Sequence, residues 1–160
     1  MLNKDKISQH MRYLSGISDW RFAIGVRIRF ANPTVTYQTY PKAWSEYYDA
    51  NHLLYQDPTI RWGMPHTGTA TWAELADQDT AGVFEKTATF GLRYGPIVSV
   101  GDVAARTLGF SAHANRPLNE VETEAATTAI ADIHAFTEGL ETTSDDELQE
   151  IRALSSLLNG

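Results

Sequence analysis

The sequence contains no cysteine, which excludes disulfides, thiolate metal sites and cysteine nucleophiles. It also lacks any apolar run approaching the roughly 18 residues that span a bilayer, and residues 1–16 have no signal-peptide core. The five histidines show no metal-ligand spacing, and no Gly-rich phosphate loop is present. These absences predict a cytoplasmic protein that does not enter a membrane and uses no metal or cofactor.

Basic residues are scarce in the C-terminal third of the chain. Residues 107–160 hold only Arg116 and Arg152 against ten carboxylates, whereas residues 1–106 hold 11 basic and 10 acidic side chains. A DNA-binding surface needs clustered lysine and arginine that displace counterions from phosphates. We therefore expect no direct DNA binding by this chain.

The chain does contain enough apolar sequence for one compact domain. It has 160 residues, of which 42% are hydrophobic and 11% aromatic, and nothing in it suggests a second domain. We expect a single domain over 1–160, with a core over about 1–142 and a C-terminal helix over 144–159.

Local patterns predict the secondary structure. Apolar residues alternate over 22–30, and 34–40 is rich in β-formers, so the two runs predict a hairpin that turns at Asn32-Pro33. Thr80, Asn119 and Ser144 are the expected helix caps. The expected elements are helix 4–15 ending at Gly16, strands 22–30 and 34–40, helix 41–55, a loop over 57–71 with one short strand, helices 72–76 and 81–90, strands 92–100 and 106–113, and helices 119–140 and 144–159. This order predicts an α+β fold in which an antiparallel β-sheet of about five strands is sandwiched between helices, an α-β-α arrangement of the PAS/GAF-like kind.

One segment, residues 39–72, concentrates amphipathic side chains. It holds Tyr40, Trp44, Tyr48, Asp57 and Trp72. A buried tryptophan or tyrosine needs a partner for its N–H or O–H, and a buried carboxylate is costly unless it accepts hydrogen bonds. One small ligand with an amide and two carbonyls would satisfy all of these groups. The segment therefore predicts a mostly apolar pocket with a few convergent polar groups, which is typical of small-molecule sites.

The spacing of these residues resembles a known family. The pattern W-x3-Y-x8-D-P-x13-W followed by a glycine is similar to the autoinducer-binding domain of LuxR-type quorum-sensing regulators. All six signature residues of that domain are matched, by Trp44, Tyr48, Asp57, Pro58, Trp72 and Gly95. The similarity extends to the stretches YPKAW, DPT and GLRYG and covers nearly the whole chain. The resemblance implies that the ligand is an N-acyl-homoserine lactone.

The resemblance also implies a role for each polar residue of the segment. Trp44 would donate to the lactone carbonyl, Tyr40 would donate to the acyl carbonyl, and Asp57 would accept from the amide N–H. Tyr48 would line the acyl side of the pocket. Thr59 follows Asp57 at a place where a second polar contact to the acyl head often lies.

The remaining matched residues are assigned to packing. Trp72, Val83 and Phe84 would surround the lactone ring, while Pro58 would rigidify the loop of Asp57 and Gly95 would permit close backbone packing. Taken singly, each aromatic residue is more often an ordinary member of the core. The joint pattern is what favours a ligand.

The resemblance implies partners as well. The family's helix-turn-helix domain, absent from this chain, would begin just after helix 144–159, so that helix is expected to be a linker and DNA to be bound only through the absent domain. A homodimer is expected. Three alternatives stay open: a sensor of the same fold for a different small molecule, a relative deficient in DNA binding that inhibits a full-length regulator by dimerisation, and an enzyme. The enzyme is disfavoured because GFSAH (109–113) lacks the second glycine of a nucleophile elbow.

The wall facing the acyl tail is expected to be polar. Thr34, Thr36, Gln38 and Tyr40 share one face of their strand by the period of two. The family match places Gly25, and with it Ala23 and Arg27, on the same side. Such a wall favours a tail that is short or carries an oxo or hydroxyl group. The alternative is that Arg27 and Gln38 lie past the end of the pocket and reach solvent.

Overall fold

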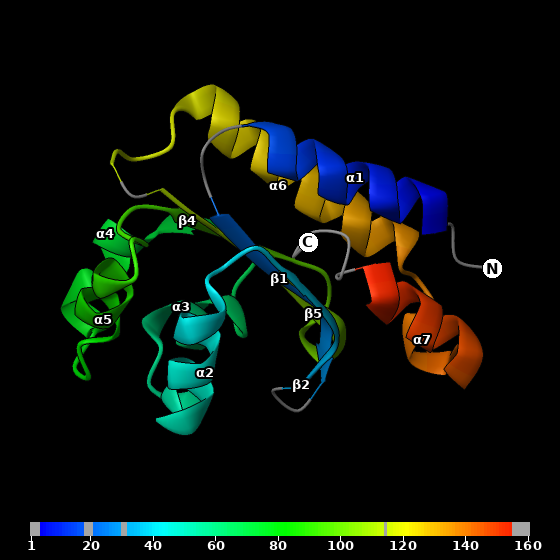
Figure 1. The fold of residues 1–160 in the computed structure, drawn as a ribbon, viewed down its shortest axis with the longest axis horizontal. Coiled ribbons are helices and arrows are strands. Elements are labelled where there is room, and N and C mark those ends of the chain that lie inside the picture. The colour runs from blue at the N-terminus through cyan, green and yellow to red at the C-terminus, as the bar shows by residue number, and fades with distance from the viewer. Residues whose placement is uncertain (1–3, 18–20, 30–31, 114, 155–160) are drawn as a thin grey trace.

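A computed structural model describes residues 4–17, 21–29, 32–113 and 115–154 of the chain (Figure 1). Its strands are β1 (Arg21–Arg29), β2 (Asn32–Gln38), β3 (Gly68–Thr71), β4 (Pro96–Val100) and β5 (Arg106–Ala112). The helices of the described part are α1 (Lys4–Ile17), α2 (Lys42–Ala50), α3 (Pro58–Gly63), α4 (Trp72–Leu75), α5 (Val83–Thr89), α6 (Glu120–Phe136) and α7 (Asp145–Ala153). None of these helices is both long enough and apolar enough to cross a bilayer.

The strands form one antiparallel sheet with helices on both faces. The strand order is β2-β1-β5-β4-β3, so β2 and β3 are the edges. Helices α1, α6 and α7 lie on one side of the sheet, and α2 to α5 lie on the other (Figure 1). The predicted α+β fold, with its antiparallel sheet between helices, is confirmed.

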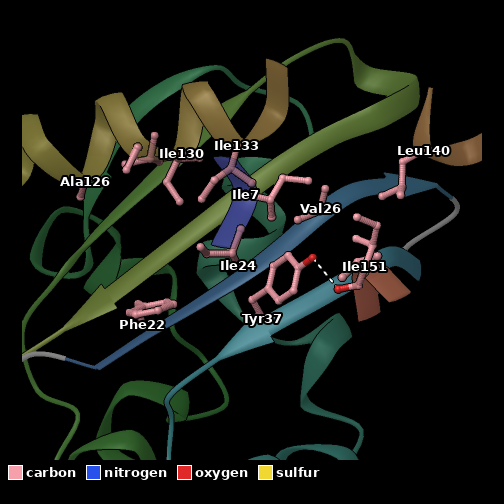
Figure 2. Packing of buried hydrophobic residues seen from close by; sticks show 13 residues of the cluster. Ile7, Phe22, Ile24, Val26, Tyr37, Ala126, Ile130, Ile133, Leu140 and Ile151 are labelled. Atoms are coloured by element: carbon pink, nitrogen blue, oxygen red, sulfur yellow. Dashed lines mark hydrogen bonds between the residues drawn. The ribbon is translucent and has the colours of Figure 1, made fainter. Parts of the chain in front are cut away.

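The larger apolar core lies between the sheet and the layer formed by α1, α6 and α7. Alternate residues of β1, such as Phe22, Ile24 and Val26, are fully buried against Ile7 and Ile133 (Figure 2). Each such side chain contributes about 1.5–3 kcal/mol by leaving water. The period of two in the sequence therefore identifies the face of β1 that packs on helices.

Helix α7 is attached to this core through the edge strand β2. The buried Tyr37 hydroxyl donates to the carbonyl of Ile151 at 2.8 Å (Figure 2). Arg152 donates to the carbonyl of Thr34 through Nε at 3.2 Å and Nη2 at 3.1 Å. Ser144 begins the helix as predicted, because its hydroxyl accepts from the Glu147 N–H.

A β-bulge in β1 corrects the prediction for Arg27. The register between β1 and β5 shifts between Gly25 and Ile28, and Arg27 takes the left-handed φ of 50°. Its guanidinium consequently points away from the cavity face, toward the end of α6, where it donates to Thr137 Oγ1 at 3.1 Å and to the His134 carbonyl at 2.6 Å. A bulge breaks the strict alternation of faces, and the C-terminal end of a helix attracts a cation.

The region from 51 to 71 differs most from the sequence prediction. Helix α2 ends at Ala50 because His52 adopts a left-handed φ of 53°. A helix over 41–55 would place Tyr55 on the same face as Trp44, but Tyr55 lies in a short 3-10 helix and is 75% exposed, whereas Trp44 is buried. The expected loop over 57–71 contains the one short strand predicted for it, β3, but also the helix α3, which was not expected. Helix α3 was missed because its sequence is rich in proline, glycine and threonine, although Asp57 caps it and Pro58 occupies its first turn.

Other boundaries move by a few residues. Helix α1 continues through Gly16. Asn32 and Pro33, the expected turn, belong to β2, and residues 30–31 lie outside the described part. The strand expected from 92 begins at Pro96. Helix α6 ends at Phe136, and Leu140 lies in a following 3-10 helix. The Asn119 cap of α6 is confirmed as a complete capping box. Residues 155–159 of the expected last helix lie outside the described residues.

Candidate ligand-binding site

A cavity of about 480 Å³ lies between the sheet and the helices α2 to α5. This volume is within the roughly 300–1,000 Å³ of small-molecule sites. Every site residue named from the sequence lines it: Tyr40, Trp44, Tyr48, Asp57, Thr59, Trp72, Val83 and Phe84. The fold therefore brings together residues that are as much as 44 positions apart (from 40 to 84) in the sequence.

Asp57 is the buried carboxylate of the cavity. Its Oδ1 accepts from the Thr59 N–H at 2.9 Å and from the Thr59 hydroxyl at 2.6 Å, and its Oδ2 accepts from the Tyr48 hydroxyl at 2.9 Å. These bonds fix the carboxylate while leaving acceptor capacity on Oδ2, since a carboxylate oxygen has two lone pairs. Because the Thr59 hydroxyl already donates its hydrogen bond to Asp57, it cannot also donate to a ligand. The role of Thr59 is therefore to hold the carboxylate in place.

Burial raises the pKa of Asp57, and the hydrogen bonds from Thr59 and Tyr48 offset this only in part. A raised pKa means that the folded state binds the proton more tightly than the unfolded chain does. The stability due to this group is therefore complete below 3.8, the ordinary value, and is lost as the pH rises through the raised pKa.

We expect this loss to be visible in the ligand-free domain. The difference in unfolding free energy between the natural protein and Asp57→Asn should shift against the natural protein as the pH rises from below 3.8. Urea unfolding of both proteins over a pH series measures it. A difference that stays constant, or that shifts in favour of the natural protein, contradicts the burial of an ionising carboxylate.

Two buried donors of the cavity have no hydrogen-bond partner within the described residues. They are the Tyr40 hydroxyl and the indole Nε1 of Trp72. Burial raises the pKa of Tyr40, and the neighbouring charge of Asp57 raises it further, so this phenol keeps its proton and remains a donor. A buried donor without an acceptor is costly, typically about 1–3 kcal/mol. The site therefore presents two donors without acceptors in the described part of the protein, and one carboxylate whose Oδ2 can still accept a further hydrogen bond.

Trp44 is held in place by aromatic neighbours. Its ring meets Tyr48 edge-on with centroids 5.6 Å apart, and it contacts Phe90 at 5.3 Å and Tyr47 at 6.0 Å. Such contacts restrict a ring to one orientation. Phe90 and Tyr47 were not singled out from the sequence, although Tyr47 lies three residues from Trp44 on α2.

Trp72 is fixed from two directions. Its ring stacks on Phe84 with centroids 5.4 Å apart, and its backbone N–H donates to the carbonyl of Gly95 at 3.0 Å. Val83 and Phe84 lie at the start of α5, whose free N–H groups donate to the Asp79 carboxylate, both at 2.8 Å. Asp79 thus replaces Thr80 as the cap, because the left-handed Gly82 places the side chain of residue 79 next to the helix end.

Gly95 occupies a point where two backbones nearly touch. A Cβ added there would lie 1.7 Å from the carbonyl oxygen of Ser111. The close backbone packing expected at this glycine is confirmed. Because the Gly95 carbonyl also bonds Trp72, the contact connects the sheet to the cavity wall.

Sequence reasoning missed part of the apolar lining of the cavity. Its lining includes Ile28 from β1, Phe110 from β5 and Leu54, Ile60 and Met64 from the α2–α3 region. Ile60 and Met64 are four residues apart, which places them on one side of a helical turn. The four-residue spacing of Ile60 and Met64 is visible in the sequence, but it was not used because residues 57–71 were expected to be mostly loop. Arg27 is not among the lining residues, whereas Thr36 and Gln38 are.

Comparisons with known proteins agree with this geometry. Residues 6–139 match the protein family described as autoinducer binding domain. The transcriptional activator protein SolR of Ralstonia nicotianae is 31% identical over 75 residues, which are 46% of this chain and 32% of SolR, so the match spans about a third of that relative.

Solved structures share the fold at low identity. Escherichia coli SdiA superposes with a TM-score of 0.64 at 20% identity, covering 92% of this chain and 69% of SdiA. SdiA in complex with octanoyl-rac-glycerol gives 0.66 at 16% identity, covering 99% and 79%. CepR2 of Burkholderia cenocepacia, described as an N-acylhomoserine lactone dependent LuxR family transcription factor, gives 0.62 at 18% identity, covering 86% and 84%.

Proposed function

We propose, from the premise that this chain belongs to the autoinducer-binding domain family of LuxR-type regulators, that its cavity binds an N-acyl-homoserine lactone and that binding controls transcription in quorum sensing. One observation carries the proposal. The buried Tyr40 hydroxyl and Trp72 Nε1 have no acceptor among the residues that the structure describes, and the buried Asp57 carboxylate lines the same cavity with acceptor capacity left over.

An acyl-homoserine lactone fits this set of groups. Its amide N–H would donate to Asp57 Oδ2, its acyl carbonyl would accept from Tyr40, and its lactone carbonyl would accept from Trp44. Trp72, Val83 and Phe84 would pack around the ring, with the Trp72 N–H beside the lactone oxygens. Tyr48 and the apolar lining residues would surround the acyl chain, whose methylenes each contribute about 0.8 kcal/mol when buried. Thr59 would act by holding Asp57.

A monoacylglycerol is the second candidate, because the similar fold of SdiA has been solved with octanoyl-rac-glycerol. A glycerol hydroxyl would donate to Asp57 in place of the amide N–H. The lactone and glycerol head groups would place different atoms beside Trp44 and Trp72. A competition binding assay between the two ligands therefore distinguishes the candidates.

Ligand binding should raise the thermal stability of the domain. At a ligand concentration a hundredfold above Kd, mass action contributes about 2.7 kcal/mol. For a domain of this size the melting temperature should rise by roughly 5–10 °C. Thermal unfolding with lactones of graded chain length, with octanoylglycerol and with the ring-opened acyl-homoserine as matched control measures it. A melting temperature that no lactone shifts, but that octanoylglycerol raises, would replace the first candidate with the second.

The proposal extends to the context of the domain. We place it in the cytoplasm, as a single sensing domain without catalytic role that pairs with a second copy and reaches DNA only through a helix-turn-helix domain. Helix α7 (Asp145–Ala153) would form part of the linker to that domain. Alternatively, a protein of this kind would inhibit a full-length regulator by pairing with it. Recovery of the lactone unchanged after incubation separates binding from catalysis, and light scattering of the purified protein gives the number of subunits.

A further inference from the structure

A pair of polar side chains forms part of the cavity wall between β2 and α2. Ser45 lies in the first turn of α2, and Gln38 is the last residue of β2. Both line the cavity, and the Ser45 hydroxyl donates to Gln38 Oε1 at 3.1 Å. The cavity wall at this point is therefore hydrogen-bonding rather than apolar.

The Ser45 bond orients the amide of Gln38. A glutamine amide has an acceptor end, Oε1, and a donor end, Nε2 with two N–H groups. Since Oε1 accepts the hydrogen bond from Ser45, Nε2 is the end of the amide that can donate to a ligand. No acceptor contacts Nε2 among the residues that the structure describes.

The neighbouring strand leaves space in front of this amide. Across the β1–β2 ladder, Gln38 pairs with Ala23, and Thr36 pairs with Gly25. All four residues line the cavity. Because Ala23 and Gly25 have the smallest side chains, a ligand chain can pass directly beside Gln38.

The position along β2 shows which part of a ligand Gln38 would meet. Tyr40, assigned above to the acyl carbonyl, lies two residues further on, just past the end of β2, so the backbones of the two residues are at most roughly 7 Å apart. A glutamine side chain reaches several ångströms from its backbone, so its amide faces the first carbons beyond the carbonyl. The apolar residues Ile28, Ile60 and Met64 remain for the rest of the chain.

We infer that Gln38, oriented by Ser45, is a specificity-determining residue whose Nε2 donates to an oxo or hydroxyl oxygen on the acyl chain close to the amide. The inference rests on the proposed function and narrows its substrate class to oxygen-substituted acyl lactones. An unsubstituted methylene at that place leaves the Nε2 donor without a partner. One hydrogen bond in such a site corresponds to a roughly three- to tenfold preference.

A matched pair of ligands tests it. Isothermal titration of the full chain with N-(3-oxohexanoyl)- and N-hexanoyl-homoserine lactone should show a roughly three- to tenfold preference for the oxo ligand. Gln38→Leu should reduce the ratio to about one by lowering the affinity for the oxo ligand, and it should not lower the affinity for the hexanoyl ligand, whose methylene no longer meets an unpaired donor. Gln78→Leu, at an exposed position outside the cavity, should keep the ratio of the natural protein.

A second variant tests the inference in case Gln38→Leu does not fold. Ser45→Ala frees the amide to rotate and should lower the preference part of the way, with the hexanoyl affinity reporting that the site is intact. Equal affinity of the natural protein for both ligands, or a preference that survives Gln38→Leu, overturns the inference and leaves lactone binding standing. If neither lactone binds the natural protein, the proposed function itself fails, and the inference fails with it.

Discussion

Replacing Asp57 with asparagine should weaken lactone binding roughly 5- to 150-fold, which corresponds to about 1–3 kcal/mol. In the natural protein Oδ1 is occupied by both donors of Thr59, and Oδ2 accepts from Tyr48 with capacity left for the ligand N–H. Asparagine can keep its oxygen toward Thr59, but its NH2 group then faces the ligand N–H, so that two donors oppose each other.

Isothermal titration against one lactone measures the loss, and Asp77→Asn is the matched control. Asp77 is exposed and does not line the cavity, so its replacement should leave the affinity unchanged. Trp44→Phe should also weaken binding, by removing the donor assigned to the lactone carbonyl. Affinity within twofold of the natural protein for both Asp57→Asn and Trp44→Phe would rule out the roles assigned to them.

Gly95→Ala should destabilise the domain by about 3 kcal/mol or more, a large part of the roughly 5–15 kcal/mol that holds a domain folded. The new Cβ would lie 1.7 Å from the Ser111 carbonyl oxygen and 2.9 Å from its carbon, both of which are backbone atoms next to the end of β5. Relief requires β5 and the segment before β4 to separate, which also displaces the Gly95 carbonyl that bonds Trp72.

Gly91→Ala is the matched control, because Gly91 has a left-handed φ of 84° and no atom within 4 Å of a built Cβ. It should cost only the roughly 1–2 kcal/mol of a left-handed alanine. Urea unfolding of the two variants gives the comparison. A loss for Gly95→Ala no larger than that for Gly91→Ala contradicts the steric argument.

The features that could be predicted from the sequence are those decided locally. Alternation along β1 identified its helix-facing residues, and Asn119 with Glu122 identified the start of α6. The family resemblance, carried by the spacing of Trp44, Tyr48, Asp57 and Trp72, implied all eight site residues that the fold gathers around one cavity. Each of these signals lies within a few residues or in a rare combination of residue types.

The features that were missed depend on distant contacts or on backbone conformation. Arg27 leaves the cavity face because β1 shifts register against β5, a strand about 80 residues later in the sequence that no local pattern reports. Tyr55 is exposed, whereas Trp44 is buried, because His52 turns the chain. Asp79 and Thr80 are both competent caps, and only the conformation of Gly82 decides between them.

Strand β2 forms part of the cavity wall with one face and holds helix α7 with the other. Thr36 and Gln38 face the cavity, while Tyr37 between them is bonded to Ile151 of α7. A strand is one covalent ribbon, so its two faces cannot move independently. As an edge strand, β2 has a ladder on only one side and is easier to displace than the central strands. An occupant that displaced Thr36 or Gln38 would therefore also displace Tyr37 and its hydrogen bond to Ile151 of α7.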